Sequence, residues 1–394
     1  MRELILSLGA LALASCAPLA DLDSGTNDAR PAVIQVTPAT SVSQDDGGPL
    51  FWDDATRAKR FRAMEAYFAG QEVAAAANPR MLARGEPFDA ATRGALDAYL
   101  GTNGTAGIMV LQDGQVRYEN YALGMTPTDR WTSFSVAKSF TSTLLGAAIA
   151  DGAIASVDDP VTRYVPGLAD TAYDGVTVGQ VATMTSGVAW DENYSDPESD
   201  VAQMLAIAPV AGESQAVTYA RTLSREAPAG EKWVYKTLET NLLGLIVEEA
   251  VDMSLAEYAN LKLVEPAGFA GKLFWMQDLT GGSIGGCCLS LRLSDYARFG
   301  QFVLEGGEGV VPAGWFDESV TPTSEFGGGF GYGYQWWTYP VGYGAQGIFG
   351  QSITILPEQD MVIAIVSNWP KATGREFGQA RLALAAQLVA AGAR

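Results

Sequence analysis

Ser135 and Lys138 stand three residues apart at the start of an apolar stretch. Residues i and i+3 share one face of a helix, so the hydroxyl and the amine can come within hydrogen-bonding distance. The small and apolar residues that follow, 141–150, predict that this helix is buried. Burial disfavours a charged amine and lowers its pKa, which would let the lysine accept the serine proton. The alternative is that Ser135 caps the helix and Lys138 extends to the surface.

The composition narrows the possible chemistry. The chain of 394 residues has 25 Lys and Arg against 45 Asp and Glu, a net charge of −20, which argues against nucleic acid as a partner. The absence of histidine excludes a Ser-His-Asp triad and the common catalytic zinc sites. Three cysteines are too few for a zinc site of four thiolates. We therefore expect no metal and no cofactor, and a hydrolase of this composition needs lysine, tyrosine or a carboxylate as its base.

The first 16 residues form a short apolar run that ends in Leu-Ala-Ser-Cys. The run is too short to span a membrane and is typical of an export signal. Its end resembles the bacterial lipobox, which would make Cys16 the lipidated N-terminus; a cleaved secretion signal is the alternative. We expect the protein in the bacterial cell envelope, lipid-anchored and periplasm-facing or secreted, with membrane contact only through a lipid on Cys16. The sequence leaves the oligomeric state open.

The rest of the chain divides into a tether and one large domain. Residues 17–50 are rich in Asp, Ser, Thr, Gly and Pro and predict a flexible tether, and residues 51–394 have the composition of a domain with a large core. Asp113-Gly114 between two apolar runs predicts a hairpin of strands 107–111 and 115–121. Further strands are expected at 332–337, 351–356 and 361–367, and helices at 54–68, 90–100 and 378–391. The pattern predicts an α+β fold, in which N- and C-terminal strands share an antiparallel sheet flanked by helices and residues 158–300 form a mainly helical lobe.

Two further stretches could take part in chemistry. Tyr235 precedes the apolar helix 241–247, and a nearby Lys138 would lower the pKa of its phenol and make it a usable base. By itself, such a tyrosine is more often a packing residue. The glycine-rich stretch 344–351 would let backbone amides approach a substrate carbonyl, although a β-bulge without a ligand explains the glycines equally well.

Together, these stretches resemble a known superfamily. Three stretches look, in sequence order, like the three motifs of serine β-lactamases and penicillin-binding proteins. They are Ser135-Val136-Ala137-Lys138, Tyr235 within Pro-x-Gly…Tyr-x-Thr, and the late glycine-rich strand. Residues 134–140, 184–194, 240–244, 285–288 and 295–300 resemble, more narrowly, the class C-like branch of 6-aminohexanoate-dimer hydrolases. The resemblance implies a β-lactamase-like fold.

The resemblance also implies roles for individual residues. Ser135 would be the nucleophile, Lys138 its activating partner and Tyr235 the proton shuttle to the leaving group. The backbone N–H groups of Ser135 and Ile348 would form the oxyanion hole. The implied activity is cleavage of amide or ester bonds in small substrates through an acyl-enzyme. The residues expected to contact the substrate are Trp190, Tyr194, Gln346 and Gly347.

Departures from the motifs keep alternatives open. Penicillin-recognising members have a cation in the third motif, where this chain has Ala345-Gln346-Gly347. A β-lactamase or D-alanyl-D-alanine carboxypeptidase is therefore the second interpretation, and a non-catalytic binding protein of the envelope is a minor third. Cys287 and Cys288 are adjacent, so we expect two buried thiols near the site rather than a bond between them.

Overall fold

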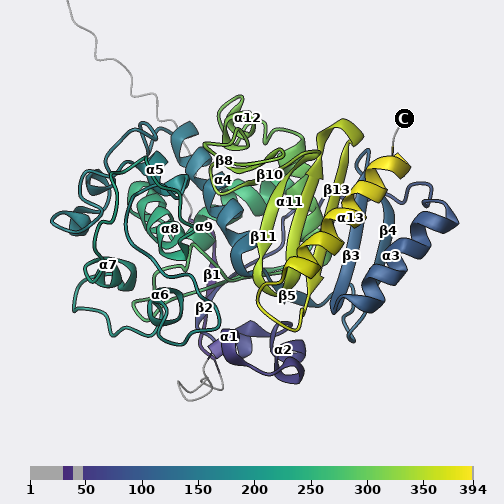
Figure 1. Cartoon of the computed structure of the whole chain (residues 1–394), viewed down its shortest axis with the longest axis horizontal. Helices are drawn as coiled ribbons and strands as arrows, with labels where there is room; N and C mark the ends of the chain where they lie inside the picture. The colour runs from purple at the N-terminus through teal and green to yellow at the C-terminus, as the bar shows by residue number, and fades with distance from the viewer. Residues whose placement is uncertain (1–29, 39–47, 393–394) are drawn as a thin grey trace, which may run out of the picture. The chain divides into compact units, whose positions relative to one another are not determined.

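The computed structural model describes residues 30–38 and 48–392. Its main element is an antiparallel sheet with the strand order β4-β3-β13-β12-β11-β10-β9-β8 (Figure 1). Strands from the two ends of the domain meet in it, because β13 lies between β3 and β12. The strands are β3 (Thr105–Gln112), β4 (Gln115–Tyr121), β8 (Ser324–Gly327), β9 (Phe330–Tyr332), β10 (Trp337–Tyr339), β11 (Gly342–Gly347), β12 (Gln351–Leu356) and β13 (Met361–Ser367).

The turn between β3 and β4 confirms the predicted hairpin. Gln112 pairs with Gln115, and the two residues between them, Asp113 and Gly114, have φ values of 54° and 69°. Positive φ at both central positions is the geometry of a type I′ turn, which Asp-Gly favours. The predicted strands 351–356 and 361–367 are also present as β12 and β13.

Helices cover both faces of this sheet. The helices α3 (Ala90–Thr102) and α13 (Arg375–Gly392) pack on one face, where Leu96 and Leu388 meet Ile108 and Ile363 in a core of their own (Figure 1). The helices α4 (Ala137–Ala150) and α11 (Leu293–Leu304) belong to the larger core on the other side. The Ser-x-x-Lys motif runs from the 3₁₀ turn before α4 into the first residues of the helix, and 12 of the 14 residues of α4 are buried.

A second, five-stranded sheet was not expected from the sequence. Its order is β1-β2-β6-β7-β5, and all its pairs are antiparallel. Its strands have three or four residues, too few to show a clear alternation of polar and apolar side chains. They are β1 (Val33–Val36), β2 (Gly70–Val73), β5 (Arg130–Thr132), β6 (Leu273–Met276) and β7 (Leu289–Arg292). Strand β1 therefore lies inside the range expected to be a tether, and two strands lie inside the range expected to be mainly helical.

The remaining helices are mostly short, and many lie between α4 and β6. The longest is α8, which follows Tyr235 and Lys236. The α-helices are α1 (Gly48–Phe51), α2 (Asp54–Arg60), α5 (Val178–Ala182), α6 (Asp200–Gln203), α7 (Gln215–Ala220), α8 (Thr237–Val251), α9 (Leu255–Ala259), α10 (Glu265–Ala267) and α12 (Trp315–Ser319). A π-helical segment covers Asn260–Val264, and 3₁₀ turns cover Met64–Ala66, Phe134–Val136, Val161–Arg163, Pro166–Leu168, Ile348–Gly350 and Pro357–Gln359.

Two expected elements differ from the structure. Residues 332–337 are not one strand, because β9 ends at Tyr332 and β10 begins at Trp337. The chain turns between them at Gln335, whose φ of 62° interrupts an extended conformation. The helix expected over 54–68 ends at Arg60 and is followed by a 3₁₀ turn.

Across residues 30–38 and 48–392, no helix has the length and apolar character needed to cross a bilayer. The leader and Cys16 lie outside the described residues.

Candidate active site

Ser135 and Lys138 face each other at the start of α4. Ser135 lies in the 3₁₀ turn that leads into the helix and is 8% exposed, whereas Lys138 is 1% exposed. Lys138 Nζ lies 3.3 Å from Ser135 Oγ, and it donates to Thr237 Oγ1 at 3.0 Å and to the Gly286 carbonyl at 2.9 Å. The N-cap position of α4 is Val136 rather than Ser135, and the Lys138 side chain does not reach the surface. The alternative of a cap and an extended lysine is therefore wrong.

Burial gives Lys138 the properties of a base. Desolvation lowers the pKa of its amine to about 8, and the negative charge of Glu192 partly opposes this shift. At neutral pH about a tenth of such an amine is unprotonated, against less than a thousandth of an ordinary lysine. A neutral amine beside a serine hydroxyl can accept its proton.

Tyr235 lies next to the Lys138 amine, but the pKa of its phenol is shifted in the opposite direction to the one expected. Lys138 Nζ is 5.1 Å from the centre of the phenol ring, and the ring of Trp337 stacks on the phenol at 5.7 Å. Burial and the charge of Glu192 raise the pKa of the phenol above its usual value, and interaction with Ser135 opposes this rise only in part. The expectation of a lowered pKa is wrong because burial is the largest influence on the phenol and raises its pKa. Tyr235 is therefore a phenol, able to donate a proton, while Lys138 is the available base.

Glu192 is a residue of the site that sequence reasoning missed. Its carboxylate accepts hydrogen bonds from the Thr237 backbone N–H at 2.9 Å and from the Tyr194 hydroxyl at 2.8 Å. It also accepts from the Trp190 indole and from the Thr237 hydroxyl. Since Thr237 in turn accepts from Lys138, a continuous chain of hydrogen bonds joins the carboxylate to the amine. The available signal was the spacing of Trp190, Glu192 and Tyr194, because alternate residues of an extended segment point to the same side.

Aromatic packing fixes the backbone on both sides of the serine. Phe134 and Phe349, which flank Ser135 and Ile348, have positive φ values of 42° and 59°. Such conformations cost roughly 1–3 kcal/mol each in non-glycine residues. Their rings pack against each other at 5.4 Å and against buried Phe61 at 4.9 and 5.5 Å. The cluster offsets the backbone cost and holds the two peptide segments that carry the candidate oxyanion donors.

Gly347 lies where β11 meets the serine turn. A Cβ atom at this position would stand 2.5 Å from the Ser133 carbonyl oxygen and 3.1 Å from the Ser135 nitrogen. Glycine is therefore required by the close approach of two backbones. This approach places the segment of Gly347 and Ile348 beside the Ser135 amide, and the pairing of β11 with β12 has no register shift that would mark a β-bulge.

The other expected substrate contacts divide into two groups. Trp190 and Tyr194 are partly buried and join the site through Glu192. Gln346 points elsewhere: its amide donates to the Tyr339 hydroxyl at 2.6 Å and accepts from the guanidinium of Arg381 on α13. The structure therefore does not bring the Gln346 side chain to the serine.

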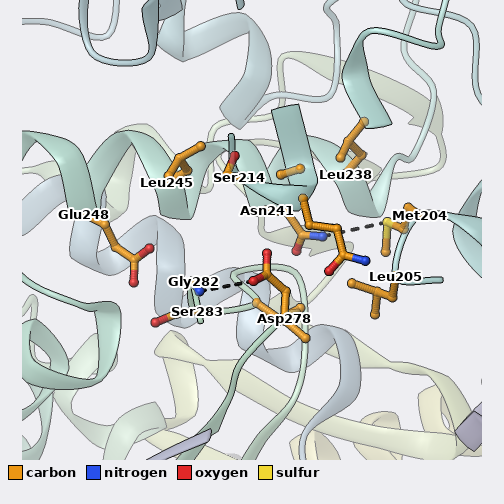
Figure 2. A pocket seen from close by; sticks show the side chains of 13 residues that line it. Met204, Leu205, Ser214, Leu238, Asn241, Leu245, Glu248, Asp278, Gly282 and Ser283 are labelled. Atoms are coloured by element: carbon orange, nitrogen blue, oxygen red, sulfur yellow. Dashed lines mark hydrogen bonds between the residues drawn. The ribbon is translucent and has the colours of Figure 1, made fainter. Parts of the chain in front are cut away.

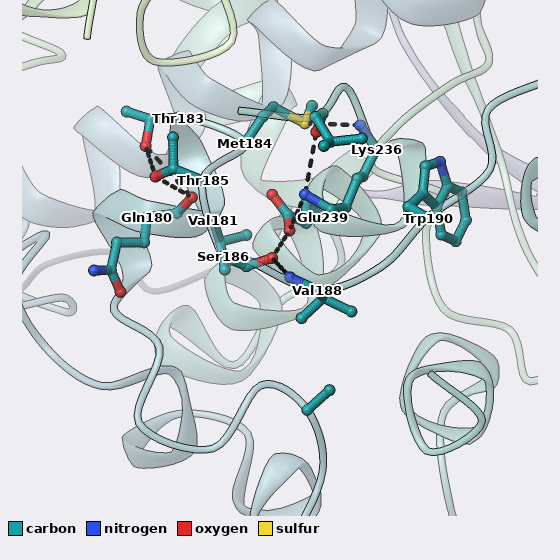
Figure 3. A network of polar contacts seen from close by, with 12 residues as sticks. Gln180, Val181, Thr183, Met184, Thr185, Ser186, Val188, Trp190, Lys236 and Glu239 are labelled. Atoms are coloured by element: carbon teal, nitrogen blue, oxygen red, sulfur yellow. Dashed lines mark hydrogen bonds and ion pairs between the residues drawn. The ribbon is translucent and has the colours of Figure 1, made fainter. Parts of the chain in front are cut away.

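A buried ion pair supports the segment that carries Tyr235 (Figure 3). Lys236 and Glu239 are both fully buried, with Lys236 Nζ 3.3 Å from Glu239 Oε1. The Ser186 hydroxyl donates to the same carboxylate and accepts from the Val188 backbone N–H at 3.1 Å. Burial raises the pKa of Glu239 to about 7, and the charge of Lys236 opposes this rise. The pair ties the start of α8 to the chain segment that leads to Trp190 and Glu192.

The two adjacent cysteines lie next to the carbonyl that binds Lys138. Cys287 and Cys288 follow Gly286 directly, and their sulfur atoms are bonded to each other. The peptide bond between them is cis, and their Cα atoms are 3.3 Å apart. The expectation of two separate thiols is wrong, because it assumed the wider spacing of a trans peptide.

A small cavity lies along α8 behind this carbonyl (Figure 2). Asn241 borders it and accepts from the Gly286 backbone N–H at 2.8 Å. Glu248, Asp278 and Ser283 surround the same space, and burial raises the pKa of Glu248 to about 7. Its volume is about 20 Å³, which is room for a water molecule and not for a substrate. In the part of the chain that is described, no three Asp, Glu, Cys or His side chains gather in a way that could hold a metal ion.

The arrangement has the features of a hydrolase that acts without histidine. A family model described as Beta-lactamase matches residues 92–274 and 289–388. The chain is 31% identical over 296 residues to 6-aminohexanoate-dimer hydrolase of Paenarthrobacter ureafaciens, across 69% of this chain and 75% of the relative. The fold and site thus define a serine hydrolase. The chain belongs to the Beta-lactamase family, as its motifs indicated.

Solved structures show the same fold. A Bacillus anthracis protein provisionally named 6-aminohexanoate-dimer hydrolase superimposes with a TM-score of 0.76 and 21% identity, across 89% of this chain and 97% of that protein. An octameric penicillin-binding protein homologue from Pyrococcus abyssi superimposes with a TM-score of 0.61 and 21% identity, across 75% of this chain and 77% of that protein. These likenesses confirm the predicted β-lactamase-like α+β architecture.

Proposed function

We propose that the protein cleaves amide or ester bonds of small substrates through an acyl-enzyme on Ser135, with Lys138 as the base. The observation that carries the proposal is the contact of 3.3 Å between Ser135 Oγ and the amine of Lys138, whose pKa burial lowers to about 8. The relative named 6-aminohexanoate-dimer hydrolase supports a small amide as the substrate class.

The proposed reaction follows from the positions of these groups. Neutral Lys138 takes the Ser135 proton as Oγ bonds to the substrate carbonyl carbon, and the amides of Ser135 and Ile348 hold the oxyanion. Tyr235, a phenol in the resting site, gives its proton to the leaving amine or alcohol as the bond to carbon breaks, and the Lys138 ammonium restores it. Water then attacks the acyl-enzyme and releases the acid. Trp190, Glu192 and Tyr194 border the site on the side of α8, and we propose that they contact the substrate.

Labelling and a substrate panel test this proposal together. A fluorophosphonate probe is expected to modify Ser135, as located by peptide mass spectrometry. The purified protein should hydrolyse p-nitrophenyl esters or 6-aminohexanoate dimer faster than nitrocefin or a D-alanyl-D-alanine peptide. The reason is that position 345, where penicillin-recognising members have a cationic side chain for the substrate carboxylate, is an alanine. Faster turnover of nitrocefin would favour the β-lactamase alternative. A protein that neither labels nor hydrolyses any of these would match the binding-protein alternative.

The rate should depend on pH through Lys138. Below its pKa of about 8 the amine is protonated and cannot accept a proton, so kcat/KM for a p-nitrophenyl ester is expected to rise with pH through this range. Glu192→Gln removes the charge that favours the ammonium, so the pKa of Lys138 should fall and the rise should move to lower pH.

The matched control for this prediction is Glu198→Gln. Glu198 is an exposed acid of the same loop, and its replacement removes the same charge without touching Lys138. Its pH profile should equal that of the unmodified protein. An unmoved profile in Glu192→Gln, or an equal displacement in both variants, would contradict the role of Glu192.

The short apolar leader and Cys16 bear on where the protein is located. We propose export to the cell envelope with lipidation of Cys16. Incorporation of labelled palmitate into the expressed protein, and its loss in Cys16→Ala, would support the anchor over a cleaved secretion signal.

A further inference from the structure

Arg381 is a buried cation that forms no ion pair with any of the described residues. It lies on α13 and is 9% exposed. Its guanidinium donates to Gln346 Oε1 and lies 5.5 Å from the ring centre of Trp369. Among the described residues no carboxylate forms an ion pair with it; the nearby acid of the same helix, Glu376, pairs with Lys371. A buried charge is usually paired, so this arginine has capacity for an anion.

An apolar cavity opens beside this arginine. Its volume is about 170 Å³, and it lies between α13 and the turn that joins β10 to β11. An apolar cavity of about 150 Å³ in another protein holds a benzene molecule. The lining side chains include Tyr339, Val341, Arg381, Leu382, Ala385 and Ala386. The space thus combines room for one six-membered ring with a single positive charge.

This cavity lies on the opposite side of β11 from the candidate nucleophile. Gly347 approaches the Ser135 nitrogen, and neighbouring residues of a strand point to opposite faces. The Gln346 side chain accordingly points to Arg381 and Tyr339. A ligand on Arg381 would therefore occupy a second site, separated from Ser135 by the strand itself.

We propose that the groove between α13 and the β10–β11 turn binds a small monocarboxylate with an apolar body, the carboxylate on Arg381 and the body against Leu382, Ala385 and Ala386. Charge complementarity supports this occupant: the arginine carries the one positive charge of the lining, and the remaining lining side chains bear no charge. An amine would meet like charge, and a neutral molecule would leave the guanidinium without an anion. The site is independent of the proposed hydrolysis.

Calorimetric titration of the full chain with benzoate tests the site. Benzoate is expected to bind at one site with a dissociation constant in the millimolar range or below. Benzamide, which has the same ring and no charge, should bind at least tenfold more weakly, since a charge-assisted bidentate contact is lost. Arg381→Met should weaken benzoate at least tenfold. Arg375→Met, which removes an exposed arginine from the same helix, should leave the affinity unchanged.

A second variant is needed because Arg381→Met also removes the hydrogen bond to Gln346 and could change the cavity in that way. Ala386 is exposed at the mouth of the cavity, so Ala386→Trp should block entry while Arg381 remains in place. Benzoate binding should then be lost. Equal binding of benzamide and benzoate, equal affinities in the two arginine variants, or undiminished binding to Ala386→Trp would each overturn the proposal. These results do not depend on whether Ser135 is a nucleophile, because no turnover is measured.

Discussion

Replacement of Ser135 by alanine is expected to lower kcat/KM for a p-nitrophenyl ester by roughly 10⁴-fold or more. The variant loses the only oxygen that Lys138 can deprotonate within this hydrogen-bonded group, because Thr237 donates its own proton to Glu192. The backbone amides near Gly347 would remain and leave a residual rate at most. Initial rates near pH 9, where Lys138 is largely neutral because its pKa is about 8, give the widest range for the measurement.

Ser142→Ala is the matched control for that variant. Ser142 lies on α4, the helix that carries Lys138, is also buried, and donates its hydrogen bond to the Tyr334 carbonyl at 2.6 Å rather than to Lys138. Its replacement should cost roughly 1–3 kcal/mol of stability and leave the rate per folded molecule unchanged. If Ser135→Ala kept the activity of Ser142→Ala, with the same circular dichroism, Ser135 would not be the nucleophile.

Lys236→Met is expected to lower the free energy of unfolding by roughly 3–5 kcal/mol, a large part of the 5–15 kcal/mol typical of a domain. Lys236 and Glu239 have no exposed side-chain surface, so the variant leaves a buried carboxylate without its cation. Burial already raises the pKa of Glu239 to about 7, and loss of Lys236 raises it further. A raised pKa stabilises the fold at low pH, and this contribution is lost as pH rises through the folded pKa. Urea unfolding should therefore show a larger deficit at pH 8 than at pH 5.

Two comparisons separate this effect from a general loss of lysine. Lys232→Met breaks the exposed pair with Glu226 and should cost no more than about 1 kcal/mol. The double variant Lys236→Met with Glu239→Gln removes both charges and keeps an acceptor for Ser186, so it should regain most of the stability. Two results would show that the Lys236–Glu239 pair contributes little to stability. One is a loss of unfolding free energy in Lys236→Met no larger than in Lys232→Met, and the other is a loss that Glu239→Gln does not reduce.

The parts of the site set by local patterns could be predicted from the sequence. The spacing of Ser135 and Lys138 across the first helical turns, and the Asp-Gly turn after β3, depend on neighbouring residues alone. Tyr235 and Gly347 required the resemblance to a family, because nothing local brings them to the serine. Structure then placed Tyr235 against Lys138 and Gly347 against Ser135.

What could not be predicted depends on contacts between distant segments. Glu192 looks like one acid among several in a polar loop, and only folding shows that Thr237, 45 residues away, donates to it. The sign of the pKa change of Tyr235 depends on total burial, which a motif does not reveal. The five-stranded sheet joins strands as far apart as β1 and β7, each too short for a periodic signal.

The central place of β13 has a consequence for how the protein matures. Strand β3 and helix α4 are made early by the ribosome, yet the sheet that supports them closes only when residues 361–367 insert between β3 and β12. The amide segment of Ile348 also comes from this last fifth of the chain. A chain that stops before β13 would contain Ser135 and Ile348, but the sheet that holds their segments in place would lack the strand between β3 and β12. The eight-stranded sheet can therefore close only after residues 361–367 have been made and have paired with both neighbouring strands.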